Sequence, residues 1–509
     1  MRRALVALVI ALVGIASAQD ARPSLRIGVT GLPDGLDPAV NINIGANGFR
    51  TLYSVFDRLI HRDFLAGGLQ PGLATAWHWV DDTTLELELR QGVKFHDGSD
   101  FGSDDVVYTF ERIIDPASDF VTARGTLKNV AQVEAVDEHT VRIHTNTPDP
   151  VLEQVLTMQE TAILPAGAYA TPEEASRFNQ LPIGTGPYKV ASFSTGDQLT
   201  LAAFDAYWQG QPTAKEVVFR VIPETAARIT ALVNGEVDII TAVPPDQLDT
   251  IRRFSGVAVR EAVLDNIHLL RYNTNNPALS DKLLRQAMNL AIDRQLLSDA
   301  LWGGAAEVPR SHQFKAFGDM YDADRPVDVY DPQRARELLA ASNYTGQTIY
   351  LNAHPTWYVN FMSASEAIVE MWRAIGIDAQ VRVVSSPAEL FGLAADDPMA
   401  MVNTWSNSMR YADPAGGLWA NWSPSGPPQA SKYWTAPEEF NRLGAEALQT
   451  TDRDVRRADY WRMLDIWEDE APGTTLYYSV EFYGVRDGVN WQPYSDFYMD
   501  LRPSNLSFD

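Results

Sequence analysis

The chain has 509 residues, of which 45% are hydrophobic and 21% are charged. This composition is typical of a globular protein with ample material for a core, and the length suggests roughly two to four domains. Acidic residues outnumber Lys and Arg by 66 to 41, and the net charge of −25 disfavours binding to nucleic acids or anionic lipids. The absence of cysteine excludes disulfides and thiolate metal sites.

Residues 1–18 have the pattern of a secretory signal peptide. Met1-Arg2-Arg3 is basic, residues 4–15 are apolar or small, and Ala16-Ser17-Ala18 is a small-residue cleavage site. The apolar run is too short to span a bilayer, and no cysteine follows the cleavage site to carry a lipid. We therefore expect a soluble periplasmic protein that is secreted through a cleaved signal peptide and is not lipid-anchored.

Strands and helices are both predicted in the next part of the chain. Residues 84–89 alternate strictly between polar and apolar types, which predicts a strand, and residues 93–96 are expected to return beside it. Ser103 is predicted to cap a helix that ends at Asp115-Pro116. Residues 224–233 predict a second helix that ends at Asn234-Gly235.

A strand over residues 237–241 and a third helix, which begins near Ser280, follow. The helix is expected to turn Leu283, Leu284, Ala287, Leu290 and Ala291 inward, and Arg285, Asp293 and Arg294 outward. This irregular mixture of helices and strands favours α/β or α+β lobes over a barrel.

The sequence carries no recognisable catalytic motif. The nucleophile-elbow, zinc-protease, phosphate-loop and dinucleotide patterns are all absent. The His96-Asp97-Gly98 run is better explained as the end of a hairpin than as a catalytic pair. Residues 404–422 differ from the rest, because they place Trp and Tyr among Asn, Ser, Gly and Pro. Aromatic rings in a polar loop are typical of ligand sites.

Several blocks of sequence resemble one protein family. The longest is PGLATAWHWVDDTTLELELRQGVKFHDGSDFGSDDVVYTFER at 71–112, and GTGPY at 184–188, NGEVDI at 234–239 and Asp413-Pro414 follow in the same order. These blocks resemble solute-binding family 5, the extracellular solute-binding proteins of the oligopeptide, dipeptide and nickel type that serve ABC importers. The resemblance covers nearly the whole chain after the signal peptide.

The resemblance implies the α/β fold of a two-lobed, hinged periplasmic binding protein of the cluster C type, with an extra subdomain in its first lobe. The first lobe is expected at 24–268, with the inserted subdomain at about 51–175, and is completed by 482–509. The second lobe is expected at 269–481. The lobes should close around a ligand, and the blocks at 96–98 and 184–188 should be structural.

One position departs from the family pattern. Peptide-binding members hold the ligand's ammonium with an Asp shortly before the Asp/Glu-Pro pair, and that position falls here on Arg410, or near Ser408 if Trp405 is aligned. No acid occurs in 406–412, and an ammonium buried without its carboxylate is costly. An Arg suits a carboxylate or phosphate. We therefore predict a ligand with an acidic group, such as an opine, a modified or acidic peptide, or a sugar acid, with a flat part on Trp405.

Two alternatives for Arg410 stay open: it pairs with an acid across the lobe interface, or it points to solvent. The predicted ligand-binding residues are Arg410, Trp405, Tyr411, Asn403, Ser408, Asn41, Asn43 and Trp419. Each of four residues has an alternative role. Asn41 and Asn43 would stabilise a turn, Asn403 would hydrogen-bond to the backbone, and Trp419 would pack in the core. No metal site or cofactor is predicted.

The predicted function is that of the substrate-binding component of an ABC import system. It would be a non-enzymatic monomer that captures a peptide-like or acidic conjugate solute in the periplasm and delivers it to an inner-membrane permease. The alternative from another class is a secreted hydrolase acting on oligosaccharide or peptide, which would need paired carboxylates or an activated nucleophile in the cleft. A lobe that signals to a membrane sensor or assists folding is a third possibility.

Overall fold

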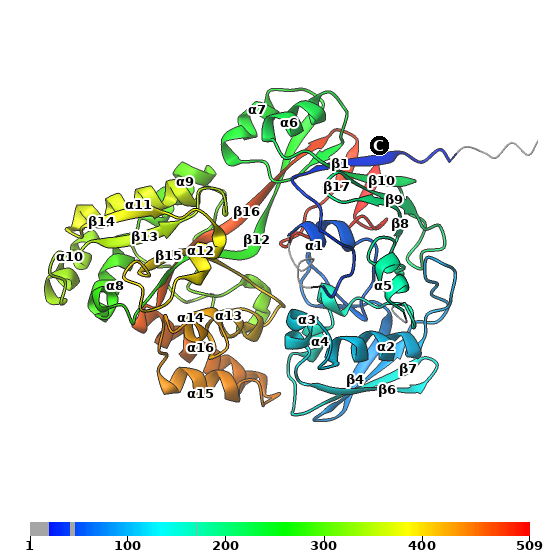
Figure 1. The fold of residues 1–509 in the computed structure, drawn as a ribbon, viewed down its shortest axis with the longest axis horizontal. Helices are drawn as coiled ribbons and strands as arrows, with labels where there is room; N and C mark the ends of the chain where they lie inside the picture. The colour runs from blue at the N-terminus through cyan, green and yellow to red at the C-terminus, as the bar shows by residue number, and fades with distance from the viewer. Residues whose placement is uncertain (1–19, 41–45, 169–170) are drawn as a thin grey trace, which may run out of the picture.

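The computed structural model describes residues 20–40, 46–168 and 171–509, and the predicted signal peptide, Asn41 and Asn43 lie outside these ranges. The chain forms two lobes that lie side by side, with two long strands running between them (Figure 1). Across the described residues, no helix has the length and apolar character needed to cross a membrane.

A ten-stranded mixed sheet runs through both lobes. Its strands lie in the order β14 (Ala379–Val383), β13 (Ile349–Ala353), β15 (Val402–Ser408), β12 (Val257–Tyr272), β16 (Gly473–Arg486), β11 (Ile239–Ile240), β1 (Ser24–Val29), β10 (Glu216–Val221), β9 (Gln198–Ala203) and β8 (Tyr188–Ser194). The central pair, β12 and β16, is antiparallel and connects the lobes. The predicted lobe boundaries at 268/269 and 481/482 fall inside these two strands, and the limits of the lobes stay predictions.

A separate four-stranded antiparallel sheet lies within the first part of the chain. Its order is β4 (Ala74–Asp81), β5 (Thr84–Leu89), β7 (Thr140–Thr145) and β6 (Val130–Asp137). Helix α2 (Ser103–Ile114) packs against this sheet through buried residues that include Val106, Phe110 and Ile113. Two-stranded ribbons are formed by β2 (Ile60–Arg62) with β3 (Leu69–Pro71) and by β17 (Val489–Trp491) with β18 (Leu506–Phe508).

The remaining α-helices flank these sheets. Those of the first part of the chain are α1 (Ala46–Leu52), α3 (Val121–Thr126), α4 (Leu152–Val155), α5 (Pro172–Phe178), α6 (Thr225–Val233) and α7 (Leu248–Arg252). Those of the second lobe are α8 (Lys282–Leu290), α9 (Arg294–Trp302), α10 (Pro332–Ala341), α11 (Phe361–Ile375), α12 (Pro387–Gly392), α13 (Leu418–Trp422), α14 (Pro427–Ala430), α15 (Glu438–Glu446) and α16 (Arg453–Glu470). Short 3-10 turns lie at η2 (Gln159–Thr161), η3 (Pro245–Gln247), η4 (Pro277–Leu279), η5 (Lys315–Met320) and η6 (Pro414–Gly416).

Local sequence explains several of these boundaries. The Asp281 carboxylate accepts a hydrogen bond from the Leu283 N–H and so caps α8, and Asp331 does the same for α10, where Pro332 is the first helical residue. Ser103, predicted as a cap, is instead the first residue of α2, and the Asp105 carboxylate accepts a hydrogen bond from the Gly102 N–H at 2.9 Å.

Two other predictions about local structure are wrong. Residues 93–96 do not form a strand beside β5, because β4 and β7 already occupy both edges of β5, and Lys94 makes only a single bridge to Asp100. Arg285 and Arg294 were expected to face outward, yet each is 3% exposed. Their guanidiniums donate to buried backbone carbonyls, among them those of Ala471 and Thr475.

The GTGPY block at 184–188 lies in close backbone contact with residues 54–55 and with His96, which are distant in sequence. The His96 ring accepts a hydrogen bond from the Gly184 N–H at 3.1 Å through Nδ1, so that Nε2 carries the proton and donates to the Gly186 carbonyl at 3.0 Å. A Cβ on Gly184 would lie 2.1 Å from the Val55 carbonyl oxygen. Only glycine fits this position.

Gly184→Ala is expected to lower the free energy of unfolding by about 1–3 kcal/mol or more, because the added methyl group would overlap a backbone atom that cannot move aside freely. Urea denaturation followed by circular dichroism measures the change. Gly392→Ala is the matched control, since a Cβ there meets no heavy atom within 4 Å. Equal midpoints for both variants would show that the packing at Gly184 is looser than the structure indicates.

Candidate ligand-binding site

A cavity of about 250 Å³ lies where the two lobes meet. Its walls come from five segments: the start of α1, residues 158–160, residues 264–266 of β12, residues 408–410 at the end of β15, and residues 495–498 of the C-terminal segment. The volume is slightly below the range of about 300–1,000 Å³ that is usual for ligand sites. A second cavity beneath Trp419 measures about 20 Å³, which is too small for a solute.

An irregularity in β12 brings polar side chains to this cavity. Val263 pairs with Val480 and Ile267 pairs with Tyr478, so that residues 264–266 stand opposite the single residue Ser479. Extra residues of this kind form a bulge, which re-aims side chains and is frequent beside functional sites. The bulge places Asp265 and Asn266 in the cavity wall.

Arg410 makes a contact between the lobes at one end of the cavity. Its Nη2 donates to the Thr126 hydroxyl at 2.7 Å and lies 3.5 Å from Oε1 of Glu160, and the Thr126 hydroxyl donates to the same Oε1 at 3.0 Å. Glu160 is 1% exposed, whereas the Arg410 side chain is 37% exposed. Arg410 therefore pairs with an acid across the lobe interface, which was one of the two alternatives that the sequence left open. Part of the Arg410 side chain remains accessible.

Two further acidic residues, Asp265 and Asp496, line the cavity. Asp265 forms an ion pair with Arg62 at 2.7 Å and accepts a hydrogen bond from the Ser495 hydroxyl at 2.8 Å. Asp496 accepts a hydrogen bond at 2.6 Å from the Phe497 N–H, and burial raises the pKa of its carboxyl group to about 6. The raised pKa means that the surroundings of Asp496 disfavour its ionised form.

Apolar side chains cover much of the remaining wall. Phe49, Met158, Leu264, Met409 and Phe497 line it. Apolar walls with a few placed polar groups are usual for small-molecule sites.

Among the predicted site residues within the described ranges, Ser408 and Arg410 line the cavity. The Ser408 hydroxyl accepts a hydrogen bond from the Asn266 amide at 2.8 Å. Trp405 lies on the same strand, and the guanidinium of Arg271 stacks on its ring at 3.9 Å. Burial lowers the pKa of Arg271 to about 10, so that Arg271 stays charged at neutral pH.

Three other predicted residues lie outside the cavity wall. Asn403 is fully buried and bonds to the Asn352 amide at 2.9 Å and to the Leu390 carbonyl. Tyr411 packs against the hydrophobic core of the four-stranded sheet and α2. Trp419 packs against Phe440, with ring centroids 6.2 Å apart. Their roles as ligand contacts are untested.

The acids and aromatic residues at 265 and 495–498 were not predicted from the sequence. The run YSDFYMD at 494–500 holds three aromatic and two acidic residues outside any helix or strand, and this concentration of aromatic and acidic side chains was a signal in the sequence. The family resemblance places this run in the C-terminal segment that completes the first lobe. That placement alone did not indicate a contact with the ligand.

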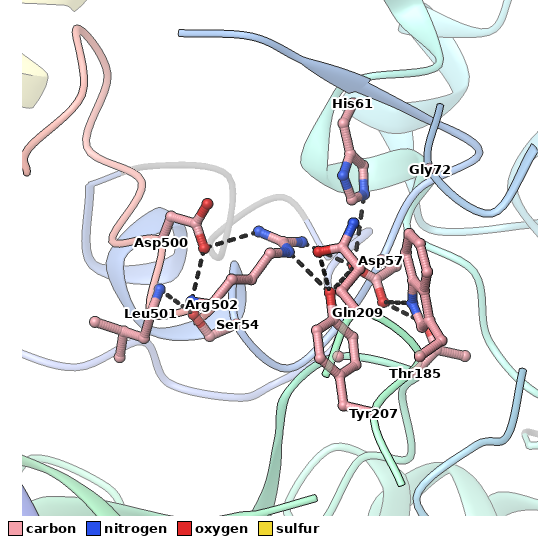
Figure 2. Close-up of polar contacts among 12 residues, drawn as sticks. Ser54, Asp57, His61, Gly72, Thr185, Tyr207, Gln209, Asp500, Leu501 and Arg502 are labelled. Atoms are coloured by element: carbon pink, nitrogen blue, oxygen red, sulfur yellow. Dashed lines mark hydrogen bonds and ion pairs between the residues drawn. The ribbon is translucent and has the colours of Figure 1, made fainter. Parts of the chain in front are cut away.

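A buried polar network holds the C-terminal segment in place beside the cavity (Figure 2). Arg502 donates to Asp57 at 2.8 Å, to the Tyr207 hydroxyl at 2.9 Å and to Asp500 at 3.1 Å. The other Asp57 oxygen accepts from Trp208 at 2.9 Å and from Thr185 at 3.2 Å. These bonds begin two residues after Tyr498, and they fix the end of the segment that lines the cavity.

The network sets the charge of its members. Burial alone would raise the pKa of Asp57, but the charge of Arg502 and the hydrogen bonds from Arg502 and Trp208 lower it below its usual value of 3.8. Burial lowers the pKa of His61 to about 3, so its ring is neutral at physiological pH and does not form an ion pair with Asp57. The Arg502 guanidinium therefore lies between two carboxyl groups, those of Asp57 and Asp500.

A second buried ion pair shapes the loop that carries Arg410. Arg456 donates from Nη2 to both oxygens of Asp413, at 2.8 and 2.9 Å, and both side chains are 5% exposed. Asp413 also accepts from the Ala415 N–H, and the Arg410 N–H donates to the Gly416 carbonyl. The Asp413-Pro414 turn is thus fixed by Arg456 from α16.

The two-lobed fold with a cavity between the lobes defines a solute-binding protein, and comparison with known proteins assigns the family. Residues 68–429 match the model of the bacterial extracellular solute-binding proteins, family 5 (middle region). The chain belongs to this family.

Relatives and solved structures agree with the assignment. The chain is 28% identical to di/tripeptide-binding protein 1 of Pseudomonas aeruginosa, with 90% of each chain covered. It is similar in structure to the ABC transporter substrate-binding protein CtaP of Listeria monocytogenes, at a TM-score of 0.85, 24% identity and coverage of 96% and 99%. It is also similar to the binding protein AgaA of A. tumefacien R10, solved with agropinic acid, at a TM-score of 0.77, 24% identity and coverage of 96% and 99%.

These findings confirm the predicted family and two-lobed α/β fold. The protein is the substrate-binding component of an ABC import system, and members of family 5 are binding components rather than enzymes. The hydrolase alternative gains no support. Within the described residues, no group of three or more His, Asp or Glu side chains is arranged to hold a metal ion.

Proposed function

We propose that this protein captures a small peptide-like solute in the cavity between its lobes and delivers it to a membrane permease. It does so as a periplasmic monomer without catalytic activity, after cleavage of residues 1–18. The observation that carries the proposal is the cavity itself, which joins both lobes, the crossing strand β12 and the C-terminal segment. A ligand that contacts both lobes stabilises the closed form, and this form is then the one presented to the permease.

The charges of the cavity narrow the class of solute. Glu160, Asp265 and Asp496 line it together with the guanidinium of Arg410. This excess of carboxylates favours a solute with a cationic group over one that is purely anionic. Arg410 retains an accessible edge for a carboxylate, so a zwitterion such as a short peptide or an amino-acid conjugate fits best. Relatives that bind di- and tripeptides support this class.

A thermal-shift screen of residues 19–509 tests the proposal. The panel holds free-amine di- to tetrapeptides, opines, sugar acids and sugar phosphates. A solute at about 100 times its Kd adds about 2.7 kcal/mol to the free energy of unfolding, which raises the melting temperature clearly. Shifts with peptides or zwitterionic conjugates are expected. Shifts confined to sugar acids or phosphates would contradict the proposed solute class.

Ser408→Trp shows whether the solute occupies this cavity. The indole would fill space that the Ser408 side chain leaves open in the cavity wall, and the expected result is loss of the ligand-induced shift. Ser425→Trp is the matched control at an exposed position away from the cavity. A full ligand-induced shift in Ser408→Trp would place the solute elsewhere.

A further inference from the structure

The wall of the cavity carries the carboxyl groups of Glu160, Asp265 and Asp496 and the guanidinium of Arg410. Asp265 has a close partner in Arg62 at 2.7 Å, and Glu160 has a weaker one in Arg410 at 3.5 Å. Asp496 forms no ion pair with any residue of the described ranges, and its one hydrogen bond comes from the N–H of the next residue, Phe497. A carboxylate in a recessed wall without a cation in direct contact is unfavourable by itself.

A second carboxylate oxygen of the same cavity also lacks a partner. Glu160 is 1% exposed, and its Oε2 accepts no hydrogen bond from the part of the chain that the structure describes. Both its neighbours, Arg410 and Thr126, contact the other oxygen, Oε1. Buried acceptors are nearly always satisfied in folded proteins. The cavity wall therefore carries one buried acceptor without a partner, on Glu160, and one partly exposed carboxylate without an ion pair among the described residues, that of Asp496.

We infer that Asp496 binds the ammonium group of the solute. This assignment rests on the proposed function and specifies how that function selects its solutes. The residue that binds the cationic group is therefore on the C-terminal segment. The loop at 406–412, where peptide-binding members of the family have an Asp, has Arg410 and no acid. The ligand's carboxylate then lies toward the accessible edge of Arg410.

The charges that face Asp496 come from several elements. Arg62 and Arg58 favour its ionised form, and Asp265 opposes it. Arg58 is 1% exposed and lies over the rings of Tyr53 and Tyr498, at 4.4 and 5.3 Å. Burial outweighs these charges and brings the pKa of Asp496 to about 6. An ammonium ligand binds the ionised carboxylate, so its affinity should fall as the pH falls through this value.

The test compares ligands and variants by isothermal titration calorimetry. The ligands are the dipeptides Ala-X, with X each of the standard amino acids, and the N-acetylated form of each dipeptide that binds. The protein is residues 19–509 as wild type, Asp496→Asn and Asp249→Asn. Asp249 is the matched control, because the substitution makes the same charge change at a residue that is 80% exposed. Thermal melts confirm that each variant is folded.

We expect Asp496→Asn to weaken binding of the free dipeptides on the order of 100-fold, as truncation of a buried charge partner does. Acetylation of the ligand should cause a similar loss in the wild type, and Asp249→Asn should change nothing. Between about pH 7.5 and about pH 5 the wild type should lose about tenfold in affinity, because most Asp496 side chains are then protonated, and Asp496→Asn should show a flatter profile.

Different outcomes overturn different claims. Wild-type binding that is equal for free and acetylated dipeptides would overturn the role of Asp496 and leave the proposed function intact, and so would unchanged affinity in Asp496→Asn. Absence of binding by the wild type to every dipeptide, to the opines and to the other conjugates of the screen would overturn the proposed solute class and this inference with it. Because acetylation alters only the ligand, the test holds even if Asp496→Asn does not fold.

Discussion

Replacing Asp57 with alanine is expected to lower the free energy of unfolding by about 3–5 kcal/mol, because the change removes one partner of a buried ion pair. Asp57 is fully buried, and the Arg502 side chain is 4% exposed. Figure 2 shows the contact between them. The substitution also leaves the donors of Trp208 and Thr185 without their acceptor. Urea denaturation followed by circular dichroism measures the loss.

The same variant should weaken solute binding, since the network fixes the chain just beyond residues 495–498. Asp205→Ala is the matched control, because the Asp205 carboxylate is 60% exposed and its pair with Arg22 should contribute less than about 1 kcal/mol. The lowered pKa of Asp57 adds a pH signature: its contribution to stability is complete well above pH 3.8 and is lost as the pH falls below that value. A variant as stable as the wild type would contradict this description of the network.

Arg456→Ala is expected to cost a similar amount, about 3–5 kcal/mol, because it leaves the Asp413 carboxylate buried without its cation. Burial already raises the pKa of Asp413 even with Arg456 present. Without Arg456 the turn at Asp413-Pro414 loses its main constraint, so Arg410 should be held less firmly and the affinity for solute should fall as well.

Arg457→Ala provides a close control for this prediction. Arg457 is the next residue on α16, is 29% exposed and pairs with Asp454, which is 82% exposed. Its replacement should change stability by less than about 1 kcal/mol. Equal urea midpoints and equal affinities for Arg456→Ala and Arg457→Ala would show that the Asp413 pair does not support the loop.

Local patterns in the sequence predicted part of the fold well. The alternation at 84–89 coincides with β5, and the apolar spacing after Ser103 coincides with α2, because both signals depend only on neighbouring residues. The outward placement of Arg285 and Arg294 was wrong for the opposite reason. Their burial depends on carbonyl groups near residues 470–475, which are close in space but almost two hundred residues away in sequence.

The candidate site was harder to predict because distant segments build it. Arg410 and Ser408 were found from the family pattern around Asp413-Pro414, and both line the cavity. Asp265 reaches the cavity through a bulge in β12, and Asp496 through a segment held by the Arg502 network. The bulge and the network both depend on contacts between distant segments, so the aromatic and acidic run at 494–500 did not by itself predict an acidic cavity.

The most direct test of the account is a crystal structure of residues 19–509 with the solute that gives the largest shift in the screen. The account predicts that the solute occupies the cavity between the lobes, with its cationic nitrogen within about 3.2 Å of an Asp496 oxygen. A solute bound elsewhere, such as beside Trp405 and Arg271, or bound in this cavity with its anionic group toward Asp496, would contradict it.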